Sequence, residues 1–538
     1  MDFPTTFVNH LGAAIAASAL ANIRSYHKDG LAPAVRNVSA QLAEITTRST
    51  TVSDVQVRAR LIGYYASARG ILFDFTGNED DLKIAVDASE QAASIPDRKE
   101  YPLEWAKQKS QHGAAIARLG GYRREATLLE LGAKEMKDAL HDLSGELLSW
   151  AKVNLNLALV YYQLFQITGS TDKLLSALEV YNHIITDDLR ARDSSIWATA
   201  QNYYGAGLVA ISEKQTNDKS LNLAMEAFMH ALEVWTSEFP TQRAMTLTNL
   251  ATAFVSLGLR QNLLDCFREA ADRLREAGRY IERQHAPRLW FTIQNNLGQA
   301  LSLLGQEEAA RCNEAIAILR NLRKTAPPSD RELSLKISFN LARALMFAGK
   351  NSESISLLRE SRDILEELLS TSSELSSDIL NELGLAHHYM GVATESLTDL
   401  HKSRAIFERL SANSNSETSP LAFIRIKMNL GATLREIGIE EDSISVLYDS
   451  VSALSYALQI TSKETSPITW ACLHTCLAAS FFQIAKRDDG HSLQKAEDSI
   501  ANALSIFGPQ HSGPTPREAR ALAHEIEQFG NEDAASRK

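Results

Sequence analysis

Residues Pro287–Gly305 read PRLWFTIQNNLGQALSLLG, and this stretch decides the fold of the chain. Proline lacks a backbone N–H and has φ preset near −65°, so Pro287 suits the first turn of a helix. Gly298 stands inside the expected helix, where glycine costs about 0.5–1 kcal/mol relative to alanine. Its presence there indicates that a second helix approaches closely. Gly305 is expected to end the first helix as a left-handed cap.

The same features recur along the chain at intervals of about 46 residues. Taking Trp290 as the register point, equivalent points fall at Trp105, Trp150, Trp197, Arg243, Ser334, Ser376, Phe423 and Trp470. Five of these points follow a proline by three residues, namely Pro102, Pro240, Pro287, Pro420 and Pro467. The unit between two points is long enough for two helices of about 18–20 residues and two short loops. The spacing therefore predicts a repeat of antiparallel helical hairpins.

Glycine and alanine recur on the same register. A large apolar residue followed by a small one stands seven and eight residues past the point, as in Leu250-Ala251, Leu297-Gly298, Leu341-Ala342, Leu383-Gly384 and Leu430-Gly431. Fifteen residues past it stand Gly120, Gly258, Gly305, Gly349, Gly391 and Gly438, which are expected to be left-handed caps. Several second helices carry triads such as Ala224-Phe228-Ala231, whose spacing places them on one helix face. Strand-like alternation with hairpin signals is absent from the sequence, so the prediction is an all-α chain.

Composition limits the classes of protein to which the chain can belong. With 538 residues it exceeds the roughly 250–300 at which a single core stops growing, so it is several domains or an array. Its net charge of −11 gives no global attraction to nucleic acid or anionic membranes. Four cysteines argue against a disulfide scaffold and for a reducing compartment, and no apolar stretch predicts a membrane span. Leu11–Ala21 is interpreted as a first helix rather than a secretory signal, and the protein is expected to be cytoplasmic.

The succession of Asn-Leu-Gly, glycine and Ala-x3-aromatic-x2-Ala resembles the tetratricopeptide repeat. More closely, Pro102–Gly120 and Pro287–Gly305 resemble the long-unit tetratricopeptide proteins of bacteria. The resemblance covers roughly residues 55–508 and implies an α-solenoid, a right-handed superhelix of about ten to eleven hairpins. Two departures stand out: the unit is longer than the standard 34 residues, and the tryptophan has moved from before the Leu-Gly pair to the helix start.

The resemblance also implies a binding groove lined by the first helices. In the family, an asparagine just before the Leu-Gly pair faces the groove and binds the backbone of an extended peptide. The matching residues here are Asn156, Asn249, Asn296, Asn340 and Asn429, six residues past their register points. The alternative is that these amides satisfy a helix terminus of the neighbouring repeat.

The charges that share this helix face, two and nine residues past the register point, are mostly basic. The basic residues are Lys107, Lys152, Lys336, Arg343 and Arg425. Thr292 and Gln299 at these positions are neutral, and Asp378 and Glu382 on the same face are acidic exceptions. Such a groove would favour an acidic segment or a chain-terminal carboxylate. The predicted groove residues are thus the five asparagines with Gln299, Lys336, Arg343 and Arg425.

Motifs for chemistry are weak in this sequence. Gly205–Ala210 fits the dinucleotide pattern G-x-G-x-x-A, but it falls inside a predicted first helix without a preceding strand and is interpreted as packing. Cys472 and Cys476 share a helix face from which His474 diverges, so no zinc site is predicted. No catalytic residue, metal or cofactor is expected. An (α/α)-barrel enzyme acting on carbohydrate stays as an alternative, because similar hairpins build that fold.

The sequence thus divides into a degenerate N-terminal hairpin cap at 1–54, a repeat array at 55–508, and a linker, capping helix (Arg517–Phe529) and polar tail at 509–538. We expect a non-catalytic interaction scaffold that binds an extended, acidic peptide in its concave groove. A peptide-sensing regulator of a partner protein is a second interpretation. Neither nucleic acid nor membrane is an expected partner, and self-association is left open.

Overall fold

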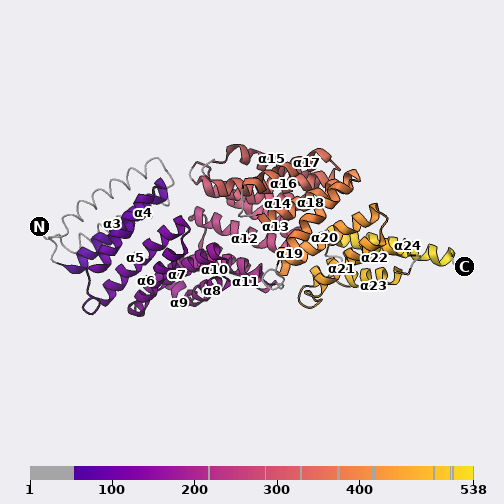
Figure 1. The fold of residues 1–538 in the computed structure, drawn as a ribbon. Coiled ribbons are helices and arrows are strands. Elements are labelled where there is room, and N and C mark those ends of the chain that lie inside the picture. Colours follow the sequence, from indigo (N-terminus) through magenta and orange to yellow (C-terminus); the bar gives the residue numbers. More distant parts are fainter. Residues whose placement is uncertain are drawn as a thin grey trace. The chain divides into compact units, whose positions relative to one another are not determined.

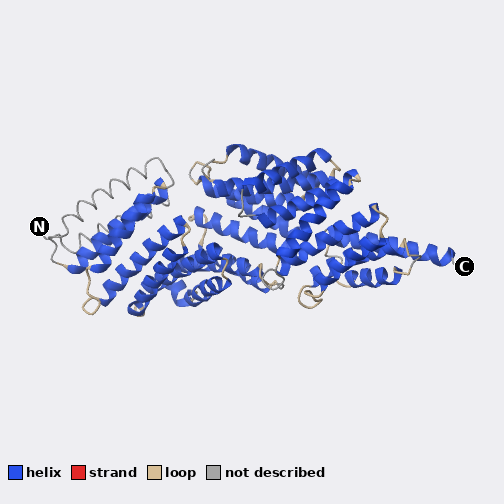
Figure 2. Cartoon of the chain, viewed as in Figure 1, coloured by secondary structure: helices blue, strands red, loops and turns tan. Residues whose placement is uncertain are grey.

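The computed structural model describes residues 54–536, except 216–217, 285, 328–329, 372–375, 415–419, 489–490, 509–510 and 512–513. Every regular element in these residues is a helix, as Figure 2 shows. The predicted all-α class of stacked helical hairpins, the α-solenoid class, is confirmed. The expected hairpin at 1–54 lies outside the described residues, apart from Asp54, whose carboxylate caps the first described helix.

The chain divides into two compact units, whose helices are labelled in Figure 1. Unit 1 contains residues up to Ile211, with Glu226–Thr246 and Gln284–Ala286. Its helices are α3 (Val55–Thr76), α4 (Glu79–Ser94), α5 (Pro102–Arg123), α6 (Ala126–Leu140), the short η2 (His141–Leu143), α7 (Leu147–Thr168), α8 (Thr171–Ile184), α9 (Asp187–Arg192) and α10 (Ser194–Ser212). Helices α11 (Lys219–Val234) and α12 (Pro240–Gln261) each contribute residues to both units.

Unit 2 contains Ser212–Met225, Leu247–Arg283 and Pro287–Lys538. Its helices are α13 (Leu264–Tyr280), α14 (Pro287–Leu304), α15 (Ala309–Thr325), α16 (Arg331–Asn351), α17 (Ile355–Thr371), α18 (Ser376–Thr394), α19 (Leu397–Asn413), α20 (Pro420–Glu440), α21 (Ile444–Leu458), α22 (Pro467–Ala485), α23 (Leu493–Leu504) and α24 (Pro514–Ser536). Its first helices from Pro287 onward are α14, α16, α18, α20 and α22. Each forms a hairpin with the second helix that follows it, which is α15, α17, α19, α21 or α23.

The register prolines and tryptophans mark the starts of first helices, as predicted. Helices α5, α12, α14, α20 and α22 each begin at their proline. The sequence reasoning missed a second regularity, in which a cation seven residues before a register tryptophan covers its ring. The charged groups of Arg98, Arg190, Arg283 and Lys463 lie 4.2, 4.5, 5.4 and 5.8 Å from the ring centroids of Trp105, Trp197, Trp290 and Trp470. These contacts hold the segment that precedes each helix, a loop or, for Arg190, the short α9, against the first turn of the helix.

The glycines eight residues past the register point are packing positions, as predicted. A Cβ added to Gly298 would lie 2.6 Å from Leu319 Cγ of α15, and one on Gly205 would lie 2.7 Å from the ring of Phe228. The Gly205–Ala210 pattern therefore lies within α10 and serves the packing of helices.

The predicted left-handed caps are wrong for the glycines fifteen residues past the point. The left-handed residues stand four positions later, at Arg124, Asn262, Glu353, Glu395 and Asp442. The glycines instead let the second helix begin close by, since a Cβ on Gly391 would lie 2.7 Å from Leu400 Cγ. The backbone N–H of Ser396 closes this turn by donating to the Gly391 carbonyl at 2.9 Å. The need for glycine is therefore steric at this position and not conformational.

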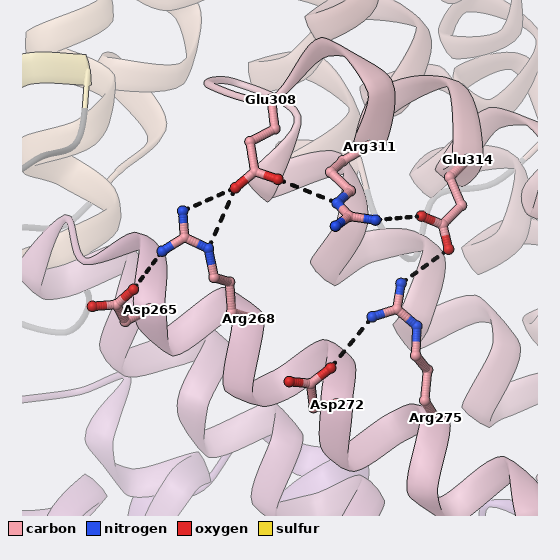
Figure 3. Close-up of polar contacts among 7 residues, drawn as sticks. All are labelled: Asp265, Arg268, Asp272, Arg275, Glu308, Arg311 and Glu314. Atoms are coloured by element: carbon pink, nitrogen blue, oxygen red, sulfur yellow. Dashed lines mark hydrogen bonds and ion pairs between the residues drawn. The ribbon is translucent and has the colours of Figure 1, made fainter.

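First helices lie on the inner side of each unit. Successive first helices contact one another directly, α3 with α5 and α5 with α7 in unit 1, and α14, α16, α18, α20 and α22 in turn in unit 2. Long charged side chains bridge successive second helices instead (Figure 3). Because the first helices are the closer set, each unit curves with its first helices inside and its second helices outside.

Arginine–glutamate pairs connect the outer helices α13 and α15. Arg268 Nη2 lies 2.9 Å from Glu308 Oε1, and Arg275 Nη2 lies 3.0 Å from Glu314 Oε1. Arg311 joins the two carboxylates, at 3.2 Å from Glu308 and 3.1 Å from Glu314 (Figure 3). We call this type of contact, from one outer helix to the next, the outer ladder. It continues from α15 to α17 through Arg320 and Glu360.

The C-terminal helix is longer than predicted. The sequence suggested Arg517–Phe529 followed by a polar tail, whereas α24 runs from Pro514 to Ser536. Residues 530–536 contain no proline, and the single glycine does not interrupt the helix. Ala519 and Ile526 are buried against α22 and α23, and Phe529 meets Phe482 edge to face at 5.6 Å. The helix thus covers the apolar end of the array.

Helix α22 is apolar and long enough to cross a membrane by length and composition, the single such helix among the described residues. Just over half of its apolar window is buried within the protein, at 56%. Ala471, Leu473, Leu477 and Phe482 are core residues of unit 2. Burial against neighbouring hairpins accounts for the apolar composition of α22.

Candidate functional site: the inner face of unit 2

The structure places eight of the nine predicted groove residues in unit 2. They are Asn249 on α12, Asn296 and Gln299 on α14, Lys336, Asn340 and Arg343 on α16, and Arg425 and Asn429 on α20. Asn156 lies in unit 1, exposed on α7. Lys336 and Arg425 are exposed, Asn340 is buried, and the other five are partly buried. The predicted residues therefore occur at several depths of the inner face.

Two of the asparagines bind amides of the preceding first helix. Asn340 Nδ2 donates to Asn295 Oδ1 at 3.1 Å, from α16 to α14. Asn429 Nδ2 donates to Asn381 Oδ1 at the same distance, from α20 to α18. Each contact occupies one of the two amide donors and leaves the side-chain carbonyl for other partners. These amides join neighbouring repeats, and their predicted role toward a peptide stays a prediction.

Each of the three predicted basic residues has a carboxylate nearby. Lys336 Nζ lies 2.7 Å from Glu332 Oε1 on its own helix. Arg425 Nη2 lies 3.6 Å from Asp378, and Arg343 Nε lies 3.8 Å from Glu382. Local pairing therefore offsets much of the positive charge that the sequence pattern suggested.

Four residues on α16 and α18 form what we call the inner site: Arg343, Lys350, Glu382 and Tyr389. The Arg343 and Glu382 side chains are 13% and 12% exposed. Arg343 Nε is buried and has no hydrogen-bond partner in the described part of the chain, because Glu382 lies beyond hydrogen-bond distance. Exposed Lys350 holds its Nζ 5.1 Å from the centroid of the Tyr389 ring. The site thus combines a largely buried guanidinium, whose Nε has no acceptor in the described residues, with an exposed cation on an aromatic face.

Sequence reasoning found Arg343 but missed Lys350 and Tyr389. Arg343 and Lys350 are seven residues apart, and Glu382 and Tyr389 are likewise seven residues apart on α18. Such spacing places each pair on one helix face. The predicted groove positions ended nine residues past the register point. Two further helical turns on the same face would have included both Lys350 and Tyr389.

Beyond the inner site, burial shifts the pKa values of His388 on α18 and of two cysteines on α22. Desolvation lowers the pKa of His388 to about 4, and its Nδ1 lies 3.2 Å from Thr433 Oγ1. Desolvation also raises the pKa of the Cys472 thiol to about 12 and that of Cys476 above its usual range. A neutral imidazole and protonated thiols are poor groups for acid–base or nucleophilic chemistry at neutral pH.

The described residues contain no cluster of side chains that could ligate a metal ion. No group of three or more His, Cys, Asp or Glu side chains is placed to hold an ion there. The inner face offers amides, paired ions and an aromatic ring, and these groups bind through hydrogen bonds and electrostatics.

No protein-family model matches the sequence, and no curated protein matches it. Two solved structures are similar to the chain over most of its length. A monomeric mutant of IFIT1 with Gppp-AAAA shares 10% identity, covers 91% of this chain and 95% of its own, and gives a TM-score of 0.44. Yeast Tom70 shares 11% identity, covers 94% of this chain and 97% of its own, and gives a TM-score of 0.36.

Proposed function

We propose that the protein is a non-catalytic interaction scaffold that binds an extended, acidic segment of another protein along the inner face of unit 2. The observation that carries this proposal is the Arg343 Nε donor, which is buried without an acceptor in the described residues. A carboxylate from a bound segment would contact the part of the Arg343 side chain that stays exposed, 13% of it, and would add to the charge of Glu382 beside it.

Lys350 and Tyr389 support the same type of ligand. Lys350 Nζ is exposed above the Tyr389 ring and is held there without a carboxylate partner in the described residues. An acidic side chain that approaches Arg343 would therefore meet a second cation two helical turns further along the same face of α16. Asn296, Gln299 and Asn429 are partly exposed on the same face and can bind a peptide backbone.

The test is affinity capture with the full chain as bait, followed by mass spectrometry. Three baits are compared: wild type, the inner variant Arg343→Gln/Lys350→Gln, and the outer control Arg359→Gln/Lys402→Gln. The control changes net charge equally at exposed positions on α17 and α19. Circular dichroism must first show that all three baits are equally folded.

We expect acidic partners to be recovered with wild type and with the outer control, and lost with the inner variant. Equal recovery with all three baits would contradict an inner binding site. A peptide-sensing regulator would use the same site, and a change in activity of the recovered partner upon binding would distinguish it from a passive scaffold.

A further inference from the structure

The start of α24 contacts a residue of unit 2 that is distant in sequence. Arg517 Nη2 forms an ion pair with Glu307 Oε2, in the loop between α14 and α15. Helices α16, α18, α20 and α22 stand between α14 and α24 in the order of the first helices. The ion pair therefore joins the two ends of this row. Because the first helices lie inside the curve of the unit, the two ends meet on its inner side.

The first turn of α24 also contacts α22. The Thr515 side chain forms a hydrogen bond with the Cys472 thiol, which opposes the larger rise that desolvation produces in the pKa of that thiol. Beyond this turn, Ala519 and Ile526 are buried in the apolar cluster that α24 shares with α22 and α23. We call Thr515–Glu518 the capping turn. Its contacts are polar, whereas burial of apolar side chains holds the rest of the helix.

Glu518 of the capping turn brings a carboxylate to the inner face. Desolvation raises the pKa values of Tyr389 on α18 and of Cys472 and Cys476 on α22, and the Glu518 carboxylate adds to each rise. Charges act on one another over short distances only, since salt screens them within about 8 Å. Tyr389 belongs to the inner site. An acidic side chain of the chain itself therefore lies beside the site proposed for an acidic partner.

The capping turn can leave the inner face with little loss of hydrogen bonding. The first four backbone N–H groups of a helix have no partner within the helix, and Pro514 and Pro516 have no N–H group. The Arg517 side chain is 61% exposed, so its pair with Glu307 contributes as weakly as a surface ion pair. Local opening of one helical turn therefore leaves the buried part of α24 in place.

We propose that the capping turn is an internal competitor for the inner site. Glu518 occupies the approach that an acidic side chain of the partner uses, and the partner binds when the turn moves away and the Arg517–Glu307 pair breaks. Because the competition concerns the inner site, it rests on the proposed function. The apparent affinity for the partner is then the intrinsic affinity multiplied by the fraction of molecules whose capping turn is open.

Arg517 offers a test in which two explanations predict opposite signs. Arg517→Gln removes a positive charge, so direct electrostatics predicts weaker binding of an acidic peptide. The same change removes the ion pair that holds the capping turn, so competition predicts tighter binding. Arg359→Gln is the matched control, because it makes the same charge change at an exposed residue of α17 that has no ion pair in the described residues. Arg517→Lys retains the charge and should retain the pair.

The experiment measures fluorescence anisotropy of a labelled peptide of alternating glutamate and serine, titrated with the full chain. Circular dichroism must first show that all variants are equally folded. We expect Arg517→Gln to bind the peptide about two- to fivefold more tightly than wild type and Arg359→Gln, and Arg517→Lys to match wild type. The inner variant Arg343→Gln/Lys350→Gln should bind the peptide more weakly than all of them.

A second measurement follows the capping turn without any ligand. Mass spectrometry gives the rate at which iodoacetamide alkylates Cys472, whose thiol contacts Thr515. This rate should be about two- to fivefold higher in Arg517→Gln than in Arg359→Gln. Cys312 of α15 is 1% exposed and serves as the internal reference, so its rate should stay unchanged. A rise at both cysteines would indicate general unfolding and would contradict local opening.

Equal or weaker peptide binding by Arg517→Gln, with binding lost in the inner variant, would overturn the competition and leave the proposed function in place. An unchanged alkylation rate of Cys472 would also overturn it, because the ion pair would then not hold the turn. A peptide that binds none of the proteins would overturn the proposed function, and the competition with it.

Discussion

At the scale of single residues, the buried amide pairs explain why asparagine recurs on the first helices. Asn295 and Asn340 are 5% and 7% exposed, and each contributes one partner to the contact between α14 and α16. The recurring asparagine stands six residues past its register point, but its partner stands five residues past the preceding point. Asn381 and Asn429 repeat this geometry. Asparagine at this position therefore has a structural use, whatever ligand it also contacts.

Replacement of Asn340 by alanine should destabilise the protein by about 1–3 kcal/mol, because Asn295 Oδ1 loses its donor in a buried environment. The measurement is the urea midpoint followed by circular dichroism. Asn156→Ala, at the equivalent position but exposed, should stay within about 0.5 kcal/mol of wild type. The double variant Asn295→Leu/Asn340→Leu should lose less stability than Asn340→Ala, since both polar partners are removed. Equal losses for Asn156→Ala and Asn340→Ala would contradict this role.

Two glycines on neighbouring helices should respond to alanine in opposite directions. A Cβ on Gly298 would lie 2.6 Å from Leu319 Cγ, so Gly298→Ala should cost about 1–3 kcal/mol through overpacking. A Cβ on Gly278 would find its nearest neighbour at 3.6 Å, so Gly278→Ala should stabilise α13 by about 0.5–1 kcal/mol. Thermal midpoints of the two variants provide the measurement. A rise in the midpoint of Gly298→Ala would show that α14 and α15 can separate freely.

At the scale of elements, salt and pH should both act on the outer ladder. The hydrogen bond from Arg268 lowers the pKa of Glu308. Desolvation raises the pKa of Glu314, but hydrogen bonds from Arg275 and Arg311 outweigh it and lower the pKa overall. A carboxyl group whose folded-state pKa is lowered stabilises the fold fully above its unfolded pKa of about 4.3. This contribution is lost as the pH falls through the folded-state value.

Glu314→Gln should therefore lower stability by about 0.2–1 kcal/mol near neutral pH, since it removes the partner of both Arg275 and Arg311. The difference from wild type should shrink at high salt and should vanish at acid pH, where the native carboxyl is protonated as well. Thermal midpoints across pH and salt give the measurement. Glu179→Gln on α8, exposed and without an ion pair in the described residues, is the control. An unchanged difference in acid would exclude an electrostatic cause.

Element order was largely predictable from the sequence, because its signals are local. The five prolines begin their helices, and Gly298 and Gly205 pack where the register requires. The short α9 was not predicted, since it interrupts the two-helix unit without altering the tryptophan register. The left-handed caps were assigned to glycine when the strained residue is Arg124 or Asn262. That error arose because a glycine required by close helix packing and a glycine required by a positive φ cannot be told apart in a sequence.

The inner site was predictable only in part, since its contacts cross repeats. Arg343 followed from the register, but Glu382 beside it and Tyr389, which contacts Lys350, belong to the next first helix. Which residues meet across two helices depends on the offset between repeats. The repeat spacing varies from 42 to 47 residues and does not fix that offset.

At the scale of the whole molecule, the array should not unfold in one step. Repeats that contact only their neighbours have stabilities that add locally, so parts of an array can unfold while others persist. Tryptophan offers a convenient reporter, because four of the six lie in unit 1: Trp105, Trp150, Trp197 and Trp235. Trp290 and Trp470 lie in unit 2. Fluorescence therefore reports mainly on unit 1, whereas circular dichroism reports on all helices.

Two variants that mirror each other should separate the transitions of the units. Gly298→Leu forces a side chain against Leu319 in unit 2, and Gly113→Leu forces one against the Gly132 carbonyl in unit 1. With Gly298→Leu, ellipticity should fall at lower urea than tryptophan fluorescence changes. With Gly113→Leu, fluorescence should change first, because the overpacked hairpin of α5 and α6 carries Trp105 and packs on α7, which carries Trp150. Coincident transitions in both variants would mean that strain in one hairpin is transmitted through the entire array, and its nearest-neighbour description would then fail.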